Sequence, residues 1–194
     1  MKKIITVPHK TLRTVATDLQ KSSGSSFLMQ ELQNALRNSN PKGAGLALPQ
    51  IDSSFRGFSV FLSAEENALD TTRPSSRKQD VQMKSFINPK IVDVPSEKTF
   101  GPDSEDPILE GCLSIPTIYG PVPRFAWLRL SYLDLNFTAH EETFYGFYAR
   151  VIQHEYDHLE GILFTDYSLR LELPLYQLDN GKMNSIPLDI VKTW

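Results

Sequence analysis

The sequence predicts an α+β fold in which mainly antiparallel strands surround one central helix and the C-terminal tail is strand-like, not helical. Three observations support this prediction. Several strand-like segments occur with few helical segments between them, which is typical of antiparallel pairing. A strong helical pattern lies near residues 145–160. Near the end, the Asn180-Gly181 pair separates two strand-like runs, which favours a β-hairpin.

Length and composition fit one domain. The chain has 194 residues, of which 40% are hydrophobic, and this is enough for a sizeable core. Neither an internal repeat nor a linker marks a second unit. We therefore expect residues 1–194 to form a single domain.

The first helix is expected over residues 25–39. Its apolar residues recur at helical spacing and would face the core; they are Leu28, Met29, Leu32, Ala35 and Leu36. Ser25 or Ser26 is a plausible N-cap. The segment Ser39-Asn40-Pro41-Lys42-Gly43 then ends the helix, because proline and glycine disfavour its continuation.

Strands are expected at 58–62, 85–88, 127–135 and 142–145, where β-branched and aromatic residues are enriched or alternate with polar ones. Residues 63–84 and 99–106 are instead polar or charged and lack apolar periodicity. We expect both segments to be surface loops.

The central helix is expected to begin at Tyr145 or Gly146 and to end at Glu160, with Gly161 as its stop. Candidates for its buried side are Phe147, Val151, Ile152, Tyr156 and Leu159. Arg150 is either a cation on the helix surface or a support for an acidic partner.

Charge and composition exclude several classes of protein. The net charge of −3 provides no basic stripe for nucleic acid. No apolar run approaches the roughly 18 residues of a membrane span, and the short run Ile4–Val7 is not an export signal. Cys112 is the only cysteine, so an internal disulfide is excluded and a reducing compartment fits. We expect the cytoplasm, or an organelle if a transit peptide has been removed.

The segment His154-Glu155-Tyr156-Asp157-His158 carries the strongest chemical signal. On a helix, the spacing of four residues places both imidazoles on one face, where they can bind one metal ion while Glu155 handles a proton of water. Asp157 would then solvate the helix face or support a ligand. The alternative is a solvated helix face whose two histidines point to water.

A catalytic metal usually has three protein ligands and one position open to water. The candidates for the third are Cys112, His9, His140 and the carboxylates. Cys112 follows Gly111, where the backbone can turn or approach another group closely. It could instead be a small buried hydrophobe or a nucleophile, but metal ligation explains more of the residues.

Three ordered segments resemble the signature motifs of peptide deformylases: Gly43-Ala44-Gly45-Leu46-Ala47-Leu48-Pro49-Gln50, Glu110-Gly111-Cys112-Leu113-Ser114 and Gln153-His154-Glu155-Tyr156-Asp157-His158-Leu159. The resemblance spans residues 43–166, and three ordered motifs are far more specific than one. It implies an enzyme that removes the formyl group from the N-terminal formylmethionine of new polypeptides, near the ribosome, and releases formate.

The resemblance also implies roles for individual residues. Cys112, His154 and His158 would bind one divalent ion, with Fe²⁺ favoured and Zn²⁺ or Ni²⁺ as other occupants. Glu155 would be general base and then general acid, while the Gln50 amide and the Leu113 backbone N–H would bind the oxyanion. Main-chain groups of Gly43, Ala44, Gly45, Glu110 and Gly111 would pair with the substrate as an added strand. Val151 would help to line a pocket for methionine.

Two features depart from the common family pattern. Leu48 stands where the family usually has a second alanine, so a larger side chain must fit near the active site or in the core. Many family members end in a long helix, whereas this chain resembles the branches without one.

Two other functions fit part of the pattern. A zinc endopeptidase shares His-Glu-x-x-His, but it more often takes its third ligand from a downstream His or Glu. A non-catalytic member that binds N-termini around a structural metal would not need Glu155 and Gln50.

Overall fold

The computed structural model describes residues 2–63, 81–102 and 106–194. Its α-helices are α1 (Ser23–Arg37), α3 (Gly146–Leu159) and α4 (Phe164–Leu171). The strands are β1 (Gly45–Ala47), β2 (Gly57–Ser63), β3 (Val81–Asp93), β4 (Lys98–Thr99), β5 (Leu109–Cys112), β6 (Ile115–Pro121), β7 (Arg124–Phe125), β8 (Trp127–Leu133), β9 (Ala139–Tyr145), β10 (Leu175–Asp179) and β11 (Lys182–Ile186). Short 3-10 helices are η1 (Lys10–Arg13), η2 (Leu48–Ile51) and η3 (Leu188–Val191).

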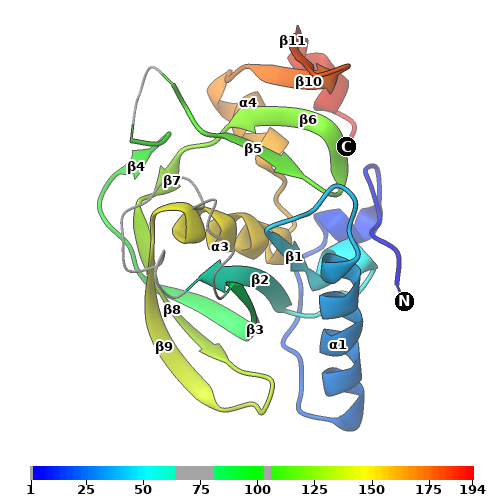
Figure 1. Ribbon diagram of the computed structural model, residues 1–194, viewed down its shortest axis with the longest axis vertical. Coiled ribbons are helices and arrows are strands. Elements are labelled where there is room, and N and C mark those ends of the chain that lie inside the picture. The colour runs from blue at the N-terminus through cyan, green and yellow to red at the C-terminus, as the bar shows by residue number, and fades with distance from the viewer. Residues whose placement is uncertain (1, 64–80, 103–105) are drawn as a thin grey trace.

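The named strands form three antiparallel sheets. The first has the order β1-β2-β3-β8-β9, the second has the order β11-β10-β6-β5, and β4 pairs with β7. Helix α3 lies between the first two sheets (Figure 1). The predicted α+β class, with antiparallel strands around a central helix, is confirmed.

The apolar side of α3 packs on the first sheet. Ala149, Ile152 and Leu159 are fully buried and belong to one cluster with Phe58, Phe86, Leu130 and Phe144 from the strands. Phe86 is the centre of the aromatic contacts, with ring centroids 4.6–5.5 Å from those of three neighbours. Burial of such rings holds the helix on the sheet, and this leaves its other side free to face the second sheet.

Helix α3 matches the prediction closely. It begins at Gly146 and ends at Leu159, with Glu160 as C-cap and Gly161 in the left-handed region at φ 69°. Of the five residues predicted on its buried side, Ile152 and Leu159 are fully buried, while Phe147, Val151 and Tyr156 are partly buried against the same cluster.

Helix α1 begins earlier than predicted. The N-cap is Ser22, so the assignment of the cap to Ser25 or Ser26 was wrong. Ser25 takes the reciprocal position in a capping box, because its hydroxyl accepts from Ser22 N while Ser22 Oγ accepts from Ser25 N. The helix ends at Arg37, two residues short of the predicted end.

The predicted strands are present. β2, β3 and β9 are longer than expected, whereas β8 ends at Leu133, two residues short of the predicted end at 135. Strand β3 starts at Val81, so residues 81–84 of the predicted 63–84 loop are strand; Ser63 ends β2, and residues 64–80 lie outside the described residues. Thr99 of the predicted 99–106 loop is in β4, and residues 103–105 are also outside the described residues. Polar composition did not prevent β3 from pairing with β2 along its first half.

The strand-like tail is confirmed as the β10–β11 hairpin, whose turn holds Asn180 at φ 47° and Gly181 at φ 78°. The short helices α4 and η3, which flank the hairpin, were not predicted. Within the described ranges, none of the helices is long and apolar enough to cross a membrane.

Candidate metal centre

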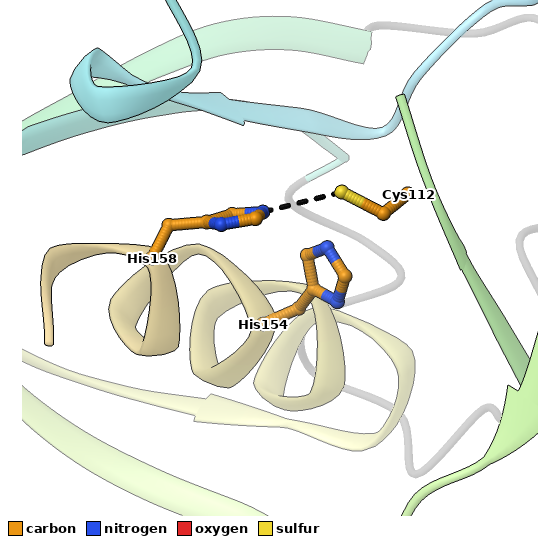
Figure 2. A group of neighbouring side chains, drawn as sticks. All are labelled: Cys112, His154 and His158. Carbon is orange, nitrogen blue, oxygen red and sulfur yellow. Dashed lines mark hydrogen bonds between the residues drawn. The ribbon is translucent and has the colours of Figure 1, made fainter. Parts of the chain in front are cut away.

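Helix α3 and strand β5 bring three potential metal ligands together. His154 and His158 lie one turn apart on α3 and point toward Cys112 on β5 (Figure 2). One ligand atom from each residue lies within 4.8 Å of the others, and Cys112 Sγ is 3.3 Å from His158 Nε2. A thiolate and two imidazoles suit a tetrahedral ion with a fourth position for water. The donor set therefore fits one divalent ion.

His154 is oriented by a buried carboxylate. Its Nδ1 lies 3.2 Å from Glu110 Oε2, so the other ring nitrogen keeps its lone pair free for a metal when Nδ1 carries the proton. Burial would raise the pKa of Glu110, but the Arg124 guanidinium and the His154 hydrogen bond outweigh it and hold that pKa well below its usual range. Glu110 is thus ionised at neutral pH.

Arg124 fixes the carboxylate of Glu110 that orients His154. Its side chain is only 2% exposed, and it donates to both Glu110 oxygens at 3.0 and 2.9 Å. It also donates to Asp157 Oδ2 on α3 at 2.5 Å, and Tyr167 of α4 donates to Asp157 Oδ1. Among the described residues, Asp157 is not part of the ligand group, and its bonds with Arg124 and Tyr167 favour an indirect supporting role, through Arg124 and Glu110, over solvation of the helix face.

Arg150 is buried, so the interpretation as a surface cation was wrong. It donates to the backbone oxygens of Thr99 and Val122, and its Nη2 lies 3.5 Å from Glu110 Oε1. Burial lowers its pKa, but the Glu110 charge opposes this shift. It supports the acidic partner of His154, as the alternative proposed.

Glu155 faces the ligand group from α3. Within the described part of the chain its Oε2 is buried without a hydrogen-bond partner, which suits a polar group awaiting water. Burial raises the pKa of its carboxyl to about 7. A Cβ on Gly45 would lie 2.5 Å from Glu155 Oε1, so the backbone of β1 approaches this carboxylate at a distance that only glycine allows.

Gln50 is fully buried on η2, so it is not a surface turn residue. Its Oε1 accepts from Ala47 N at 2.8 Å, and its Nε2 donates to Ser114 Oγ at 3.2 Å and to Cys112 Sγ at 3.4 Å. The amide is therefore fixed with its N–H groups toward the ligand group.

A cavity of about 200 Å³ contains the centre. The residues predicted to pair with the substrate, Gly43, Ala44, Gly45, Glu110 and Gly111, line it, together with Gln50, Cys112, Leu113, His154 and Glu155. Ile108, Phe147 and Val151 give it an apolar wall, as expected for Val151. His158 is fully buried and contributes to the ligand group from behind.

Leu48 does not shape this cavity. It is fully buried in a different cluster with Met29, Leu36 and Ile51, between α1 and the first sheet. Of the two places left open for its larger side chain, the structure thus favours the core.

Sequence reasoning missed Arg124, Ser114 and Tyr167. Ser114 stands in the second motif, but no role was predicted for it, and its partner Gln50 is 64 residues away in the sequence. Arg124 and Tyr167 meet Asp157 from two other elements. A weak signal exists for Arg124, since it is a single cation between apolar strand segments.

The comparisons with known proteins agree with this geometry. A family model described as polypeptide deformylase matches residues 1–173. A peptide deformylase of Cytophaga hutchinsonii is 36% identical over 188 residues, which cover 94% of this chain and 89% of that protein. A probable peptide deformylase of Synechococcus phage S-SSM7 is 30% identical, with a TM-score of 0.70 over 86% of this chain and 99% of its own. A class I type b deformylase of Acinetobacter baumannii with bound Met-Ala-Ser has 30% identity and a TM-score of 0.67, covering 84% and 96%.

Proposed function

The chain belongs to the peptide deformylase family, and we propose that it removes the formyl group from the N-terminal formylmethionine of new polypeptides and releases formate. The observation that carries this proposal is the convergence of Cys112, His154 and His158 beside the buried carboxylate of Glu155. Hydrolysis of an amide needs an activated water, a proton carrier and donors for the oxyanion. Each requirement has a candidate group in the cavity.

Cys112, His154 and His158 would hold one divalent ion. Such an ion lowers the pKa of a water from about 15.7 toward 7, and it polarises the carbonyl. Mixed thiolate and imidazole donors suit Fe²⁺, Zn²⁺ and Ni²⁺ alike. We favour Fe²⁺ because of the resemblance to the family, with Zn²⁺ and Ni²⁺ as the other candidates. The ionised Glu110 keeps His154 in the tautomer that ligation requires.

Glu155 would accept the proton of the attacking water and later give it to the leaving amine. A base works best when its pKa lies near the working pH. Burial raises the pKa of Glu155 to about 7, which meets this condition before an ion is bound. The neighbouring cation would favour the ionised, proton-accepting form.

The Gln50 amide and the Leu113 backbone N–H would stabilise the oxyanion. Gln50 is held by Ala47 N and Ser114 Oγ, so its amide is fixed beside the ligand group, and the N–H that now donates to Cys112 Sγ is the one that would turn to the oxyanion. Leu113 follows the ligand Cys112 directly and lines the same cavity.

The substrate would bind as a strand between two sheets. β1 is the end strand of the first sheet and β5 is the end strand of the second, and residues at both edges line the cavity. Gly43, Ala44 and Gly45 would pair with the peptide on one side, and the backbone of Glu110 and Gly111 on the other. Only the backbone of Glu110 is available, since its side chain holds Arg124 and His154. The methionine side chain would enter the apolar end near Phe147 and Val151.

We place the whole of residues 1–194 in one catalytic domain that acts in the cytoplasm, near the ribosome, or in an organelle. The thiol of Cys112 supports a reducing compartment, because oxidation would remove the ligand. The endopeptidase and the non-catalytic binder receive no support from the relatives, which are named peptide deformylases.

One substrate comparison tests the proposed reaction. We expect the metal-loaded protein to release formate from formyl-Met-Ala-Ser and to leave an internal peptide bond of an unformylated peptide intact. Cleavage of the internal bond would favour the endopeptidase, and binding of the formylated peptide without formate release would favour the binder.

A further inference from the structure

A second cavity, of about 450 Å³, adjoins the metal cavity. The two share five lining residues: Gly43, Ala44, Gly111, Cys112 and Leu113. His154 and Glu155 line only the first cavity whereas Cys112 lines both, so the second cavity extends from the Cys112 side of the ligand group. A peptide whose formyl end lies at the ligand group and whose first side chain fills the apolar wall would therefore continue into the second cavity.

Tyr119 stands at the boundary between the two cavities. It lines the second one, and its ring lies so close over Gly111 that a Cβ there would be 2.6 Å from Tyr119 Cε1. Tyr119 is paired in register with Gly111 on one side and with Tyr176 on the other. Directly paired residues share one face of an antiparallel sheet. The two tyrosines are both partly exposed, and they extend the sheet face that begins at Gly111 of β5.

The C-terminal hairpin continues this face. Leu178 is paired with Met183, and strand alternation places both on the face that carries Tyr176. They are 36% and 44% exposed, which is high for apolar side chains that adjoin one another. The opposite face of the hairpin carries Leu175 and Ile186, which pack into the core beneath the second sheet. We name Tyr119, Tyr176, Leu178 and Met183 the hairpin strip.

We propose that the hairpin strip binds downstream residues of the substrate polypeptide and favours apolar and aromatic side chains there. This inference rests on the proposed function. The occupant follows from continuity, because the strip begins at the cavity that shares five residues with the metal cavity. The preference follows from chemistry, because none of the four side chains is charged. The hairpin lies beyond residues 1–173, so the preference would be a property of this chain beyond the matched family region.

The test compares formylated peptides that share the start formyl-Met-Ala-Ser. One ends there, a second continues with three serines, and a third continues with leucine and phenylalanine. For the native enzyme we expect kcat/KM to be about three- to tenfold higher for the third peptide than for the other two, as one or two aromatic or apolar contacts would give. We expect the ratio to fall to about one in Tyr176→Ala.

Because Tyr176→Ala could lose the preference through misfolding, a second variant tests the strip independently. Leu178→Ser combined with Met183→Ser changes only exposed side chains and should also remove the preference. Gln177→Ala, on the same strand but on the opposite face, should keep it. Equal kcat/KM for all three peptides in the native enzyme, or a preference that survives both strip variants, would overturn the inference and leave the proposed function standing. Absence of formate from every peptide would overturn the proposed function and this inference with it.

Discussion

Glu155 and Gly45 lie in direct contact, and this contact joins the first and the third sequence motifs. The carboxylate belongs to α3, whereas the glycine begins the end strand of the first sheet. The position of the Glu155 carboxylate, our proposed proton carrier, therefore depends on how closely β1 approaches α3. Two substitutions separate the chemistry of Glu155 from its placement.

Replacement of Glu155 removes the proposed proton carrier. We expect Glu155→Ala to retain the metal ion, because Cys112, His154 and His158 are intact, and to lower kcat by about 10²- to 10⁴-fold. Metal content and formate release from formyl-Met-Ala-Ser measure the two effects separately. Turnover near that of the native enzyme would contradict the role of general base.

Replacement of Gly45 displaces the same carboxylate. In Gly45→Ala the new Cβ would lie 2.5 Å from Glu155 Oε1, so one of the two must shift. We expect kcat/KM to fall by about 100-fold, as a displacement of about 1 Å near the reacting atoms can cause. The control is Gly24→Ala in α1, whose Cβ would meet its nearest neighbour at an ordinary 3.7 Å. If both variants kept native kinetics, the close approach would have no catalytic importance.

For single residues, the sequence predicts a role where the chemistry depends on neighbours close in the chain. Two histidines four residues apart share a helix face whatever the rest of the fold does, so His154 and His158 could be predicted. Cys112 could be proposed as the third ligand because it is the only thiol of the chain, whereas Gln50 needed the resemblance to a family, because sequence separation hides its contact with Cys112. Arg124 could not be predicted, since its partners Glu110 and Asp157 come from different elements.

Among the elements, β7 is fastened to β5 and α3 by one buried cation. Arg124 of β7 pairs with Glu110 of β5 and Asp157 of α3. We expect Arg124→Met to lower the free energy of unfolding by about 3–5 kcal/mol, because two buried carboxylates would lose their counterion. Urea denaturation measures the loss.

Arg129 on β8 provides the matched control. It pairs with Asp93 and Glu141, but its side chain is 45% exposed. Exposed ion pairs contribute about 0–1 kcal/mol, so Arg129→Met should change stability little. A similar decrease in the free energy of unfolding for the two variants would show that the burial of Arg124 adds nothing to stability.

Strand β9 is joined to β3 and β8 through Glu142. Burial would raise the pKa of this carboxyl, but hydrogen bonds from Lys84 and Tyr132 outweigh it and the pKa is lowered. A lowered pKa means that the bonds stabilise the fold above the ordinary carboxyl range, near pH 4.5, and lose this effect as the pH falls through the folded pKa. We expect Glu142→Gln to lower Tm at pH 7 and to have little effect near pH 3. If Glu142→Gln lowered Tm equally at pH 7 and at pH 3, the stabilising role of the ionised Glu142 carboxylate would be contradicted.

Element boundaries were predictable where a local signal exists and not where pairing decides. Gly161 marks the end of α3, and Asn180-Gly181 marks the hairpin turn. The early start of β3 carries no such signal, because Val81 to Lys84 are strand only through their register with β2. Serines at 22, 25 and 26 could all cap α1, and the reciprocal bonds of Ser22 and Ser25 decide between them.

In the whole molecule, the active centre depends on a helix held between two sheets (Figure 1). The sequence predicted the antiparallel class and the central helix, because both follow from periodicity. It did not predict that β1 and β5 would be the end strands that border the cavity, since strand order is set by contacts between distant segments. It also did not predict α4, whose Tyr167 completes the network around Arg124.

The central claim is that the Cys112, His154 and His158 group makes this chain a metal-dependent deformylase. Anaerobic purification followed by metal analysis and formate release from formyl-Met-Ala-Ser, repeated for each metal form, tests it most directly. We predict about one divalent ion per chain, loss of formate release with a chelator, and recovery on addition of Fe²⁺. Formate release that persists without any ion, or a metal-loaded protein that releases none, would contradict the claim.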